Sequence, residues 1–284
     1  MFYAAYGAVL SSSEPLPELT SFTHAEPDLF VTCTNETAAG EGWRWVGASD
    51  PSSASWLAVA AGPGGYRLVF DGGGEFIVSV DDRRIISMTR SADADTIRHL
   101  LIDQVVPLVL AHRGRLVLHA SAVETPAGAV ALLGPAGAGK STLTASFGVH
   151  GARVLADDAL VVDDGGDEWL ARPAYAGVRV WPDVLAVLHS GGRSPRVAPY
   201  TDKRRVGPDE GLAFCAQPVR LSRIYVLDLD EVERITIAPL SGREAMIAVV
   251  GQTFTLDASD TARAARQLDR AHALCRDVAV RRLR

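Results

Sequence analysis

An apolar segment that runs straight into a glycine-rich loop constrains the fold of this chain more than any other feature. Residues 129–133, Ala-Val-Ala-Leu-Leu, predict a buried strand, and residues 134–141 follow as Gly-Pro-Ala-Gly-Ala-Gly-Lys-Ser. A helical pattern begins at Lys140. Strand, glycine loop and helix in this order form the context in which the P-loop pattern is meaningful. The segment therefore predicts an α/β unit built around a phosphate-binding loop.

The residue types in this loop suit the chemistry of a nucleoside triphosphate. Glycines let backbone amides turn toward the β- and γ-phosphates, and the helix N-terminus adds a favourable dipole. Lys140 supplies a cation, Ser141 can ligate Mg²⁺, and Thr142 can contact the α-phosphate. A glycine turn that merely starts a helix is the alternative, which the complete match disfavours. We predict ATP and Mg²⁺ as cofactors, bound by Gly134, Pro135, Ala136, Gly137, Ala138, Gly139, Lys140, Ser141 and Thr142.

A second acidic element follows the predicted P-loop helix. Residues 153–156 predict a strand, and Asp157 and Asp158 come directly after it, near the phosphate end of the sheet. One carboxylate can serve Mg²⁺ while the other orients an attacking hydroxyl and accepts its proton, as in a kinase. We assign Ser141 and Asp157 to the metal, and both aspartates with Lys140 to catalysis; which aspartate is the base stays open. A strand-end turn is the alternative, and it is our interpretation of residues 163–166, Asp-Asp-Gly-Gly.

The length of 284 residues favours two domains. Residues 1–92 contain short apolar and aromatic segments separated by turn residues, which predict a small β-rich domain folded as a meander. Residues 93–284 predict an α/β P-loop domain, so the expected fold class is mixed α/β. The strands predicted in the first domain are 29–33, 43–46, 56–59, 66–70, 75–80 and 84–88, with turns at 71–74 and 81–82.

Apolar spacing predicts the elements of the second domain. Asp93 or Asp95 can cap a linking helix, and Pro107 should kink this helix or end its regular part. Residues 116–123 and 129–133 predict the two strands of a hairpin. The remaining predicted elements are a helix at 140–150 that stops at Gly151, a strand at 160–162, a helix opened by residues 178–182, a strand at 222–228 and a helix at 260–277.

Charge and cysteine content disfavour several classes of protein. The net charge is −6 and basic residues gather only at 203–205 and 281–284, so we expect no nucleic-acid partner. No apolar run reaches the roughly 18 residues of a membrane span and no basic leader begins the chain, so we expect no membrane partner and a cytoplasmic location. Cys33, Cys215 and Cys275 form no CxxC pair, which disfavours zinc and disulfides.

Three segments together resemble the HPr serine kinase/phosphorylase family: residues 118–123 (Leu-His-Ala-Ser-Ala-Val), the P-loop, and residues 150–158 (His-Gly-Ala-Arg-Val-Leu-Ala-Asp-Asp). The resemblance covers roughly residues 95–284. It implies a kinase domain with a phosphoenolpyruvate-carboxykinase-like fold, a histidine before the loop, an aspartate pair that serves magnesium and proton transfer, and, because HPr kinases are hexameric, a homo-oligomer. His119, which alone would be taken as a core histidine, then joins Asp157 and Asp158 as a catalytic candidate.

The chain departs from true HPr kinases in two places. Its β-rich N-terminal segment differs from theirs, and no Glu-Ile-Arg-Gly-type signature follows the aspartate pair. Residues 175–183 and 199–206 instead resemble the HPr-kinase-like proteins of peptide-tailoring systems, which include kinases that phosphorylate lasso-peptide precursors at a serine. Arg179, Lys203 and Arg204 are candidate phosphate or substrate contacts, because cations stabilise the transferred phosphoryl group; solvated surface charge is the alternative.

These observations lead to one leading hypothesis and two alternatives. The chain is expected to be an ATP-dependent serine kinase whose partner is a peptide or small protein, with a lasso-peptide precursor favoured and the N-terminal domain contributing to recognition. HPr or a small metabolite as the acceptor is one alternative. The other is a nucleotide-binding regulatory protein that transfers no phosphate, which the aspartate pair disfavours.

Overall fold

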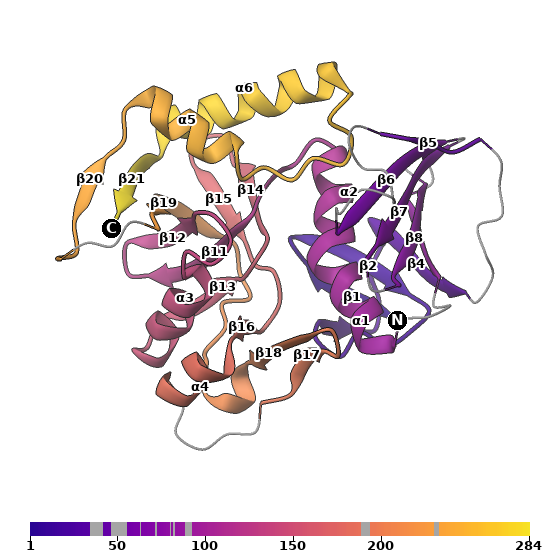
Figure 1. The fold of residues 1–284 in the computed structure, drawn as a ribbon, viewed down its shortest axis with the longest axis horizontal. Helices are drawn as coiled ribbons and strands as arrows, with labels where there is room; N and C mark the ends of the chain where they lie inside the picture. Colours follow the sequence, from indigo (N-terminus) through magenta and orange to yellow (C-terminus); the bar gives the residue numbers. More distant parts are fainter. Residues whose placement is uncertain are drawn as a thin grey trace.

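The computed structural model describes residues 1–34, 42–46, 56–62, 64–71, 73–79, 81, 83–88, 93–188, 194–229 and 233–284. Figure 1 shows two large sheets on either side of one long helix, with a small sheet below them. The fold is mixed α/β, as predicted. One cluster of buried apolar side chains continues from the first sheet through the helix into the second sheet. No helix in the described residues is long and apolar enough to cross a membrane.

The first sheet has nine strands in the order β3-β1-β2-β4-β9-β8-β7-β6-β5. The predicted meander is wrong, because β2 pairs with β4, and β4 with β9, in parallel, so that the last strand returns to the middle of the sheet. Strands β1, β2 and β3 were not predicted; the predicted turns at 71–74 and 81–82 lie partly outside the described residues. The strands are β1 (Phe2–Ala5), β2 (Ala8–Ser12), β3 (Thr20–Phe22), β4 (Leu29–Thr34), β5 (Arg44–Trp45), β6 (Leu57–Gly62), β7 (Gly65–Phe70), β8 (Glu75–Ser79) and β9 (Arg84–Met88).

The linking helix consists of α1 (Ala94–Leu100), the π-helical turn η1 (Leu101–Val105) and α2 (Val106–His112). Asp93 caps it, because its side chain accepts a hydrogen bond from the backbone N–H of Thr96 at 3.0 Å. Pro107 does not end the helix. A proline ring clashes with the carbonyl four residues earlier, here that of Asp103, and the chain widens into the π-helical turn around that residue.

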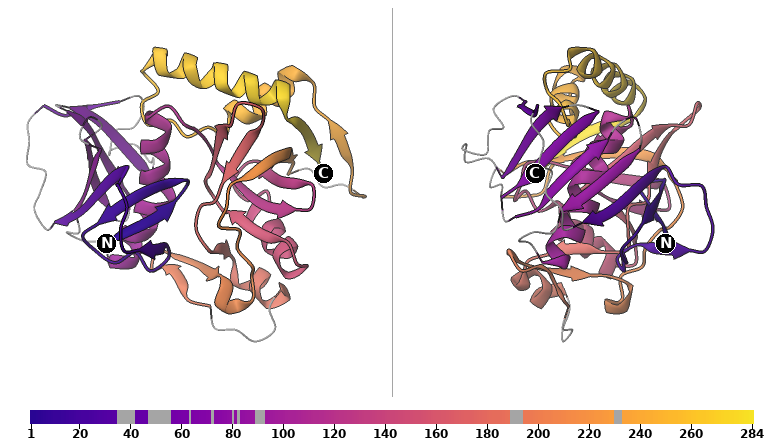
Figure 2. Two further views of the ribbon diagram at one scale, coloured as in Figure 1. Left: turned by 180° about the vertical axis from the view of Figure 1, so that it is seen from behind. Right: turned by 90° about the vertical axis from the view of Figure 1, so that its right-hand side faces the viewer.

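The second sheet carries the glycine-rich loop. Its strands run in the order β10-β14-β15-β19-β12-β11-β13, with β21 beside β19 and β20 beside β21. The predicted strand, loop, helix and strand are present as β12, the loop, α3 and β13, with β11 between the two strands. Figures 1 and 2 show α3 on one side of this sheet and α5 and α6 on the other. The bounds are β10 (Leu116–Leu118), β11 (Ala120–Thr125), β12 (Gly128–Leu133), α3 (Lys140–Val149), β13 (Arg153–Ala156), β14 (Leu160–Asp164), β15 (Trp169–Arg172), β19 (Val219–Leu227), β20 (Ile237–Pro239), α5 (Gly242–Val250), α6 (Thr261–Asp277) and β21 (Ala279–Leu283).

Two predicted elements differ in the structure. Residues 116–123 are not one strand, because the chain breaks at His119: β10 pairs with β14 and β11 with β12. At the break, the backbone N–H of His119 donates to the carbonyl of Gln252 at 2.6 Å. The predicted helix at 178–182 begins only at Pro182, where α4 (Pro182–Leu188) starts after β16 (Val178–Val180). Alternating β-branched valines favour the strand, and proline suits the first position of a helix.

A small three-stranded sheet is formed by residues that lie between β15 and β19 in the sequence. Strands β16, β17 (Arg196–Ala198) and β18 (Thr201–Val206) pair in the order β16-β18-β17, and the 3₁₀ helix η2 (Pro208–Glu210) follows. A second apolar cluster, distinct from the main core, joins this sheet to α3. The middle of β16 lies beside the start of α3, because Asp157 accepts hydrogen bonds from both Ser141 Oγ and the backbone N–H of Arg179. The members of this cluster are Ala145, Val154, Val178, Val180, Val206 and Leu212.

Candidate active site

The glycine-rich loop of residues 134–139 curls ahead of α3 through left-handed backbone conformations. Gly137 has φ +83° and Gly139, the N-cap of α3, has φ +89°. A Cβ at either position would meet no atom within 4 Å, so backbone conformation rather than space requires glycine there. Lys140 reaches back across the loop, and its Nζ donates to the carbonyls of Gly134 at 2.7 Å and Pro135 at 3.2 Å. Its ammonium group is thereby fixed inside the loop.

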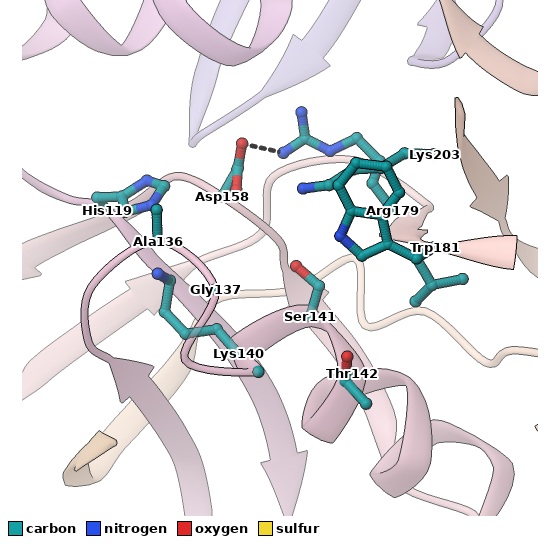
Figure 3. A pocket seen from close by; sticks show the side chains of 12 residues that line it. His119, Ala136, Gly137, Lys140, Ser141, Thr142, Asp158, Arg179, Trp181 and Lys203 are labelled. Carbon is teal, nitrogen blue, oxygen red and sulfur yellow. Dashed lines mark ion pairs between the residues drawn. The ribbon is translucent and has the colours of Figure 1, made fainter. Parts of the chain in front are cut away.

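A cavity of about 230 Å³ opens above this loop. Figure 3 shows Lys140 and Ser141 on the loop side, His119 on one flank, and Trp181 and Lys203 on the other, with the carboxylate of Asp158 paired with Arg179. The cavity thus brings together many of the residues selected from sequence. Its lining consists of His119, Ala136, Gly137, Gly139, Lys140, Ser141, Thr142, Asp158, Arg179, Val180, Trp181 and Lys203.

Asp157 lies behind Ser141 rather than in the cavity lining. The residue is fully buried, and its Oδ1 accepts hydrogen bonds from Ser141 Oγ at 2.8 Å and Ser121 Oγ at 2.7 Å. Its Oδ2 accepts the backbone N–H of Arg179 at 2.9 Å. These bonds offset the cost of burying a carboxylate. Ser121 is not among the residues predicted from the sequence; its only sequence signal is a hydroxyl in an otherwise apolar strand, two residues after His119.

Asp158, unlike Asp157, lines the cavity. Its φ of +69° lies in the left-handed region that a non-glycine residue adopts at a cost of about 1–2 kcal/mol, and such strain often occurs at functional sites. Its Oδ2 forms an ion pair with Arg179 Nη2 at 2.6 Å. Burial alone would raise the pKa of Asp158, but the charge of Arg179, followed by that of His119, lowers it from 3.8 to about 2. The carboxylate is ionised at neutral pH.

His119 and Lys140 are shifted toward their neutral forms. Burial lowers the pKa of His119 below 6.5, although the charge of Asp158 acts in the opposite direction, so the imidazole is neutral at pH 7. Burial also lowers the pKa of Lys140, again opposed by Asp158. His119 takes its place in the cavity because the break between β10 and β11 falls on it. A neutral imidazole there can accept a proton.

The three predicted basic residues have different surroundings. Arg179 is buried and pairs with Asp103 as well as with Asp158. Lys203 lines the cavity, with its Nζ 5.5 Å from the ring centroid of Trp181. Arg204 is absent from the cavity lining and donates instead to the carbonyl of Ser194 at 3.4 Å. Successive side chains of a strand point to opposite faces, so these neighbours on β18 do not both face the cavity.

The donor set suits a magnesium ion that is bound together with a nucleotide. The described part of the chain contains no group of three or more histidine, cysteine, aspartate or glutamate residues able to hold a metal alone. A magnesium ion beside a P-loop needs fewer protein ligands, because phosphate oxygens and water complete its shell. The hydroxyl of Ser141 and the carboxylate of Asp157, 2.8 Å apart, supply a hydroxyl and an acidic oxygen in one place. The three cysteines are free thiols.

Comparisons with known proteins give limited information. No family model matches the chain, and neither does any curated protein. Among solved structures, the chain is similar to the Hpr(Ser) kinase/phosphatase from Coxiella burnetii, with 13% sequence identity and a TM-score of 0.27. The alignment covers 56% of this chain and 96% of that one. With a TM-score this low, we base no conclusion on the match.

Proposed function

We propose that this chain is an ATP-dependent kinase that transfers the γ-phosphoryl group to a serine hydroxyl of a peptide or small protein. One observation carries the proposal: the two adjacent carboxylates that follow β13 have different partners. Asp157 contacts the hydroxyl of Ser141, and Asp158 lines the cavity beside Lys140. A metal ligand and a group that orients the acceptor are what phosphoryl transfer requires next to a phosphate-binding loop.

The loop side of the cavity would hold the nucleotide. The backbone amides of the loop and the N-terminus of α3 suit phosphate oxygens, and the ammonium of Lys140 offsets their charge. Ser141 and Asp157 would hold Mg²⁺, which when bound neutralises negative charge on the β- and γ-phosphates. Arg179 and Lys203 add positive charge on the opposite wall.

Asp158 would orient the acceptor hydroxyl. In the transfer, the serine Oγ forms a bond to the γ-phosphorus, the bond from that phosphorus to the oxygen of ADP breaks, and the hydroxyl proton leaves the serine. With a pKa of about 2, Asp158 accepts the hydrogen bond of the hydroxyl but is a weak base. His119, neutral at pH 7 in the same cavity, is the stronger base and is our candidate for taking up the proton.

The rim of the cavity favours an acceptor larger than a metabolite. Trp181 lines the cavity, is 50% exposed and lies between β16 and α4. Exposed aromatic side chains supply apolar contact area for a peptide at little cost in side-chain entropy. A lasso-peptide precursor is the acceptor that the sequence resemblance suggests, with the N-terminal sheet as a further surface for its recognition.

Mass spectrometry of precursor peptides tests this function. The protein is incubated with ATP, Mg²⁺ and serine-containing precursor peptides encoded near its gene, and the peptides are examined for one added phosphoryl group. We expect addition at a serine that disappears in Lys140→Ala and Asp158→Asn and persists in Asp164→Asn, a matched aspartate of the other acidic pair. ATP binding without transfer to these peptides, to HPr or to small metabolites would instead indicate a nucleotide-dependent regulator.

A further inference from the structure

A buried ionic network connects the linking helix to the cavity. Asp103, on the π-helical turn η1, is 1% exposed. Its Oδ2 accepts a hydrogen bond from Arg179 Nη1 at 2.9 Å and lies 2.6 Å from His99 Nδ1. Arg179 is the only member of this trio that lines the cavity described above. The network therefore joins Asp103 and His99, which lie outside the cavity, to Arg179, which lines it.

Arg179 bridges two carboxylates that come from different parts of the fold. While Nη1 is held by Asp103, Nη2 reaches Asp158 Oδ2 at 2.6 Å. The guanidinium is planar, so fixing one nitrogen also fixes the direction of the other. Burial alone would lower the pKa of Arg179, but the charges of Asp103 and Asp158 hold it well above its usual value. Arg179 therefore remains charged and oriented between them.

The position of Asp103 is costly for the fold. The helix is otherwise apolar here, with Leu101, Ile102 and Val105 all buried, so another apolar residue would continue its buried face. A buried carboxylate and its partner are often replaced by apolar residues without loss of stability. Stability alone does not explain this aspartate.

Two buried tyrosines complete the surroundings of Asp103. Tyr6 comes from the turn between β1 and β2, and Tyr175 precedes β16. Their hydroxyl groups and Asp103 Oδ1 have no hydrogen-bond partner among the described residues. Burial raises the pKa of both tyrosines well above 10, and the charge of Asp103 adds to the effect. Both hydroxyls thus stay protonated, as donors in the field of this carboxylate.

We infer that Asp103 is a positioning residue for phosphoryl transfer: it holds Arg179 so that the guanidinium keeps Asp158 directed into the cavity. This inference rests on the proposed kinase function. Arg179 Nε already lies 3.7 Å from Asp157 Oδ2. Without Asp103, the guanidinium is free to close on Asp157, the partner of Ser141, and to draw away from Asp158. The charge in the cavity would be unchanged while its geometry is lost.

Asp103→Asn, compared with Glu18→Gln, tests the inference. Glu18 is a matched control because its carboxylate is also buried and pairs with arginines, namely Arg98 of α1 and Arg205 of β18. Neither of these arginines lines the cavity, whereas Arg179, the partner of Asp103, does. We expect Asp103→Asn to lower kcat by about 10–100-fold, with KM for ATP within about 2-fold of the wild type. The substitution displaces Arg179 and Asp158 but removes no contact to ATP. Glu18→Gln should lower Tm with kcat within about 2-fold.

A kcat of Asp103→Asn equal to that of the wild type, or equal losses in both variants, would overturn the inference. If Asp103→Asn does not fold, His99→Leu is the deciding variant. It removes the other group that contacts Asp103 Oδ2 and leaves the charge of Asp103 in place. We expect a kcat loss of about 3–10-fold for His99→Leu, again with KM for ATP preserved; an unchanged kcat overturns the inference. Failure of the kinase function has another signature, since the wild type then transfers no phosphate to any acceptor, and both proposals fall.

Discussion

Two Asp-Asp pairs lie at the ends of β13 and β14, which are consecutive in sequence, and they serve different purposes. Asp158, after β13, has a left-handed backbone, lines the cavity and shares its arginine with another carboxylate. Asp163, at the end of β14, has two arginines of its own, with Arg115 Nη2 at 2.5 Å and Arg172 Nε at 2.7 Å. Its neighbour Asp164 is exposed and accepts the N–H of Gly166 in a turn at 2.8 Å.

The comparison shows that the dipeptide carries little information by itself. The negative charge of Asp163 is neutralised by two arginines, which hold its carboxylate in one place. Asp157, by contrast, accepts hydrogen bonds from two serine hydroxyls. Asp158 lines the cavity together with Arg179. The partners of a carboxylate, rather than its sequence neighbours, decide whether chemistry is available to it.

The largest difference between the two pairs should appear in catalysis. Asp158→Asn is expected to lower kcat for phosphate transfer by about 10³-fold, because the acceptor hydroxyl loses the group that orients it, while ATP affinity changes by less than about 3-fold. Asp163→Asn should keep kcat and lower Tm. Steady-state kinetics with isothermal titration of ATP measure both effects. Comparable kcat losses in the two variants would remove the distinction.

The second difference concerns the metal. We expect Asp157→Asn to raise the Mg²⁺ concentration needed for half-maximal transfer by about 10–100-fold, because Ser141 alone holds the ion poorly. Asp164→Asn, the corresponding change in the exposed pair, should leave this concentration unchanged. Titration of the transfer rate with Mg²⁺ at saturating ATP provides the measurement. An unshifted titration curve for Asp157→Asn would show that this aspartate does not serve the metal.

A third difference should appear in acid. The pKa of Asp158 is about 2 in the folded chain against 3.8 as its ordinary value, which is worth about 2 kcal/mol of folding free energy at neutral pH. Because the folded pKa is the lower one, this stabilisation is complete above about pH 5 and falls to about half by pH 3. The stability advantage of the wild type over Asp158→Asn in urea should therefore shrink over that range. A constant advantage would mean that Asp158 is not paired in the folded state.

The smallest effect extends the contrast to another pair of sequence neighbours. Lys203 faces the cavity and Arg204 does not, so Lys203→Ala should raise KM for ATP or for the acceptor by about 3–10-fold, and Arg204→Ala should change it by less than about 2-fold. Initial rates at varied concentrations of each substrate separate the two constants. Equal effects of the two changes would place Arg204 at the site as well.

Local signals in the sequence were sufficient for several elements. Asp93 caps the linking helix as predicted, the helix predicted at 260–277 is present as α6, and α3 ends before Gly151, whose φ is +95°. Such features depend on residues a few positions apart. The glycine-rich loop was found for the same reason, since its strand, loop and helix are contiguous.

Tertiary contacts decided what the sequence did not reveal. Asp103 and Arg179 are 76 residues apart, and no local pattern links them. The one available signal was an acidic residue in the middle of an apolar helical segment, four residues before Pro107. The parallel pairing of β4 with β9 was hidden in a similar way, because alternation along a strand does not name its partner. Lys203 and Arg204 could be separated only once the face of β18 was known.

The packing of the linking helix restricts how related proteins can exchange their N-terminal regions by recombination. Its first turns pack on the first sheet, where a Cβ at Gly74 would lie 2.4 Å from Leu100 Cδ1, while Asp103 on the same helix contacts Arg179 of the small sheet. A recombination breakpoint at residue 93 would join a foreign sheet to a helix shaped for another partner. A breakpoint at residues 113–115 would preserve that packing, but residue 103 and Arg179 would then come from different proteins. Neither junction is neutral, so the sheet, the helix and the arginine are expected to diversify together.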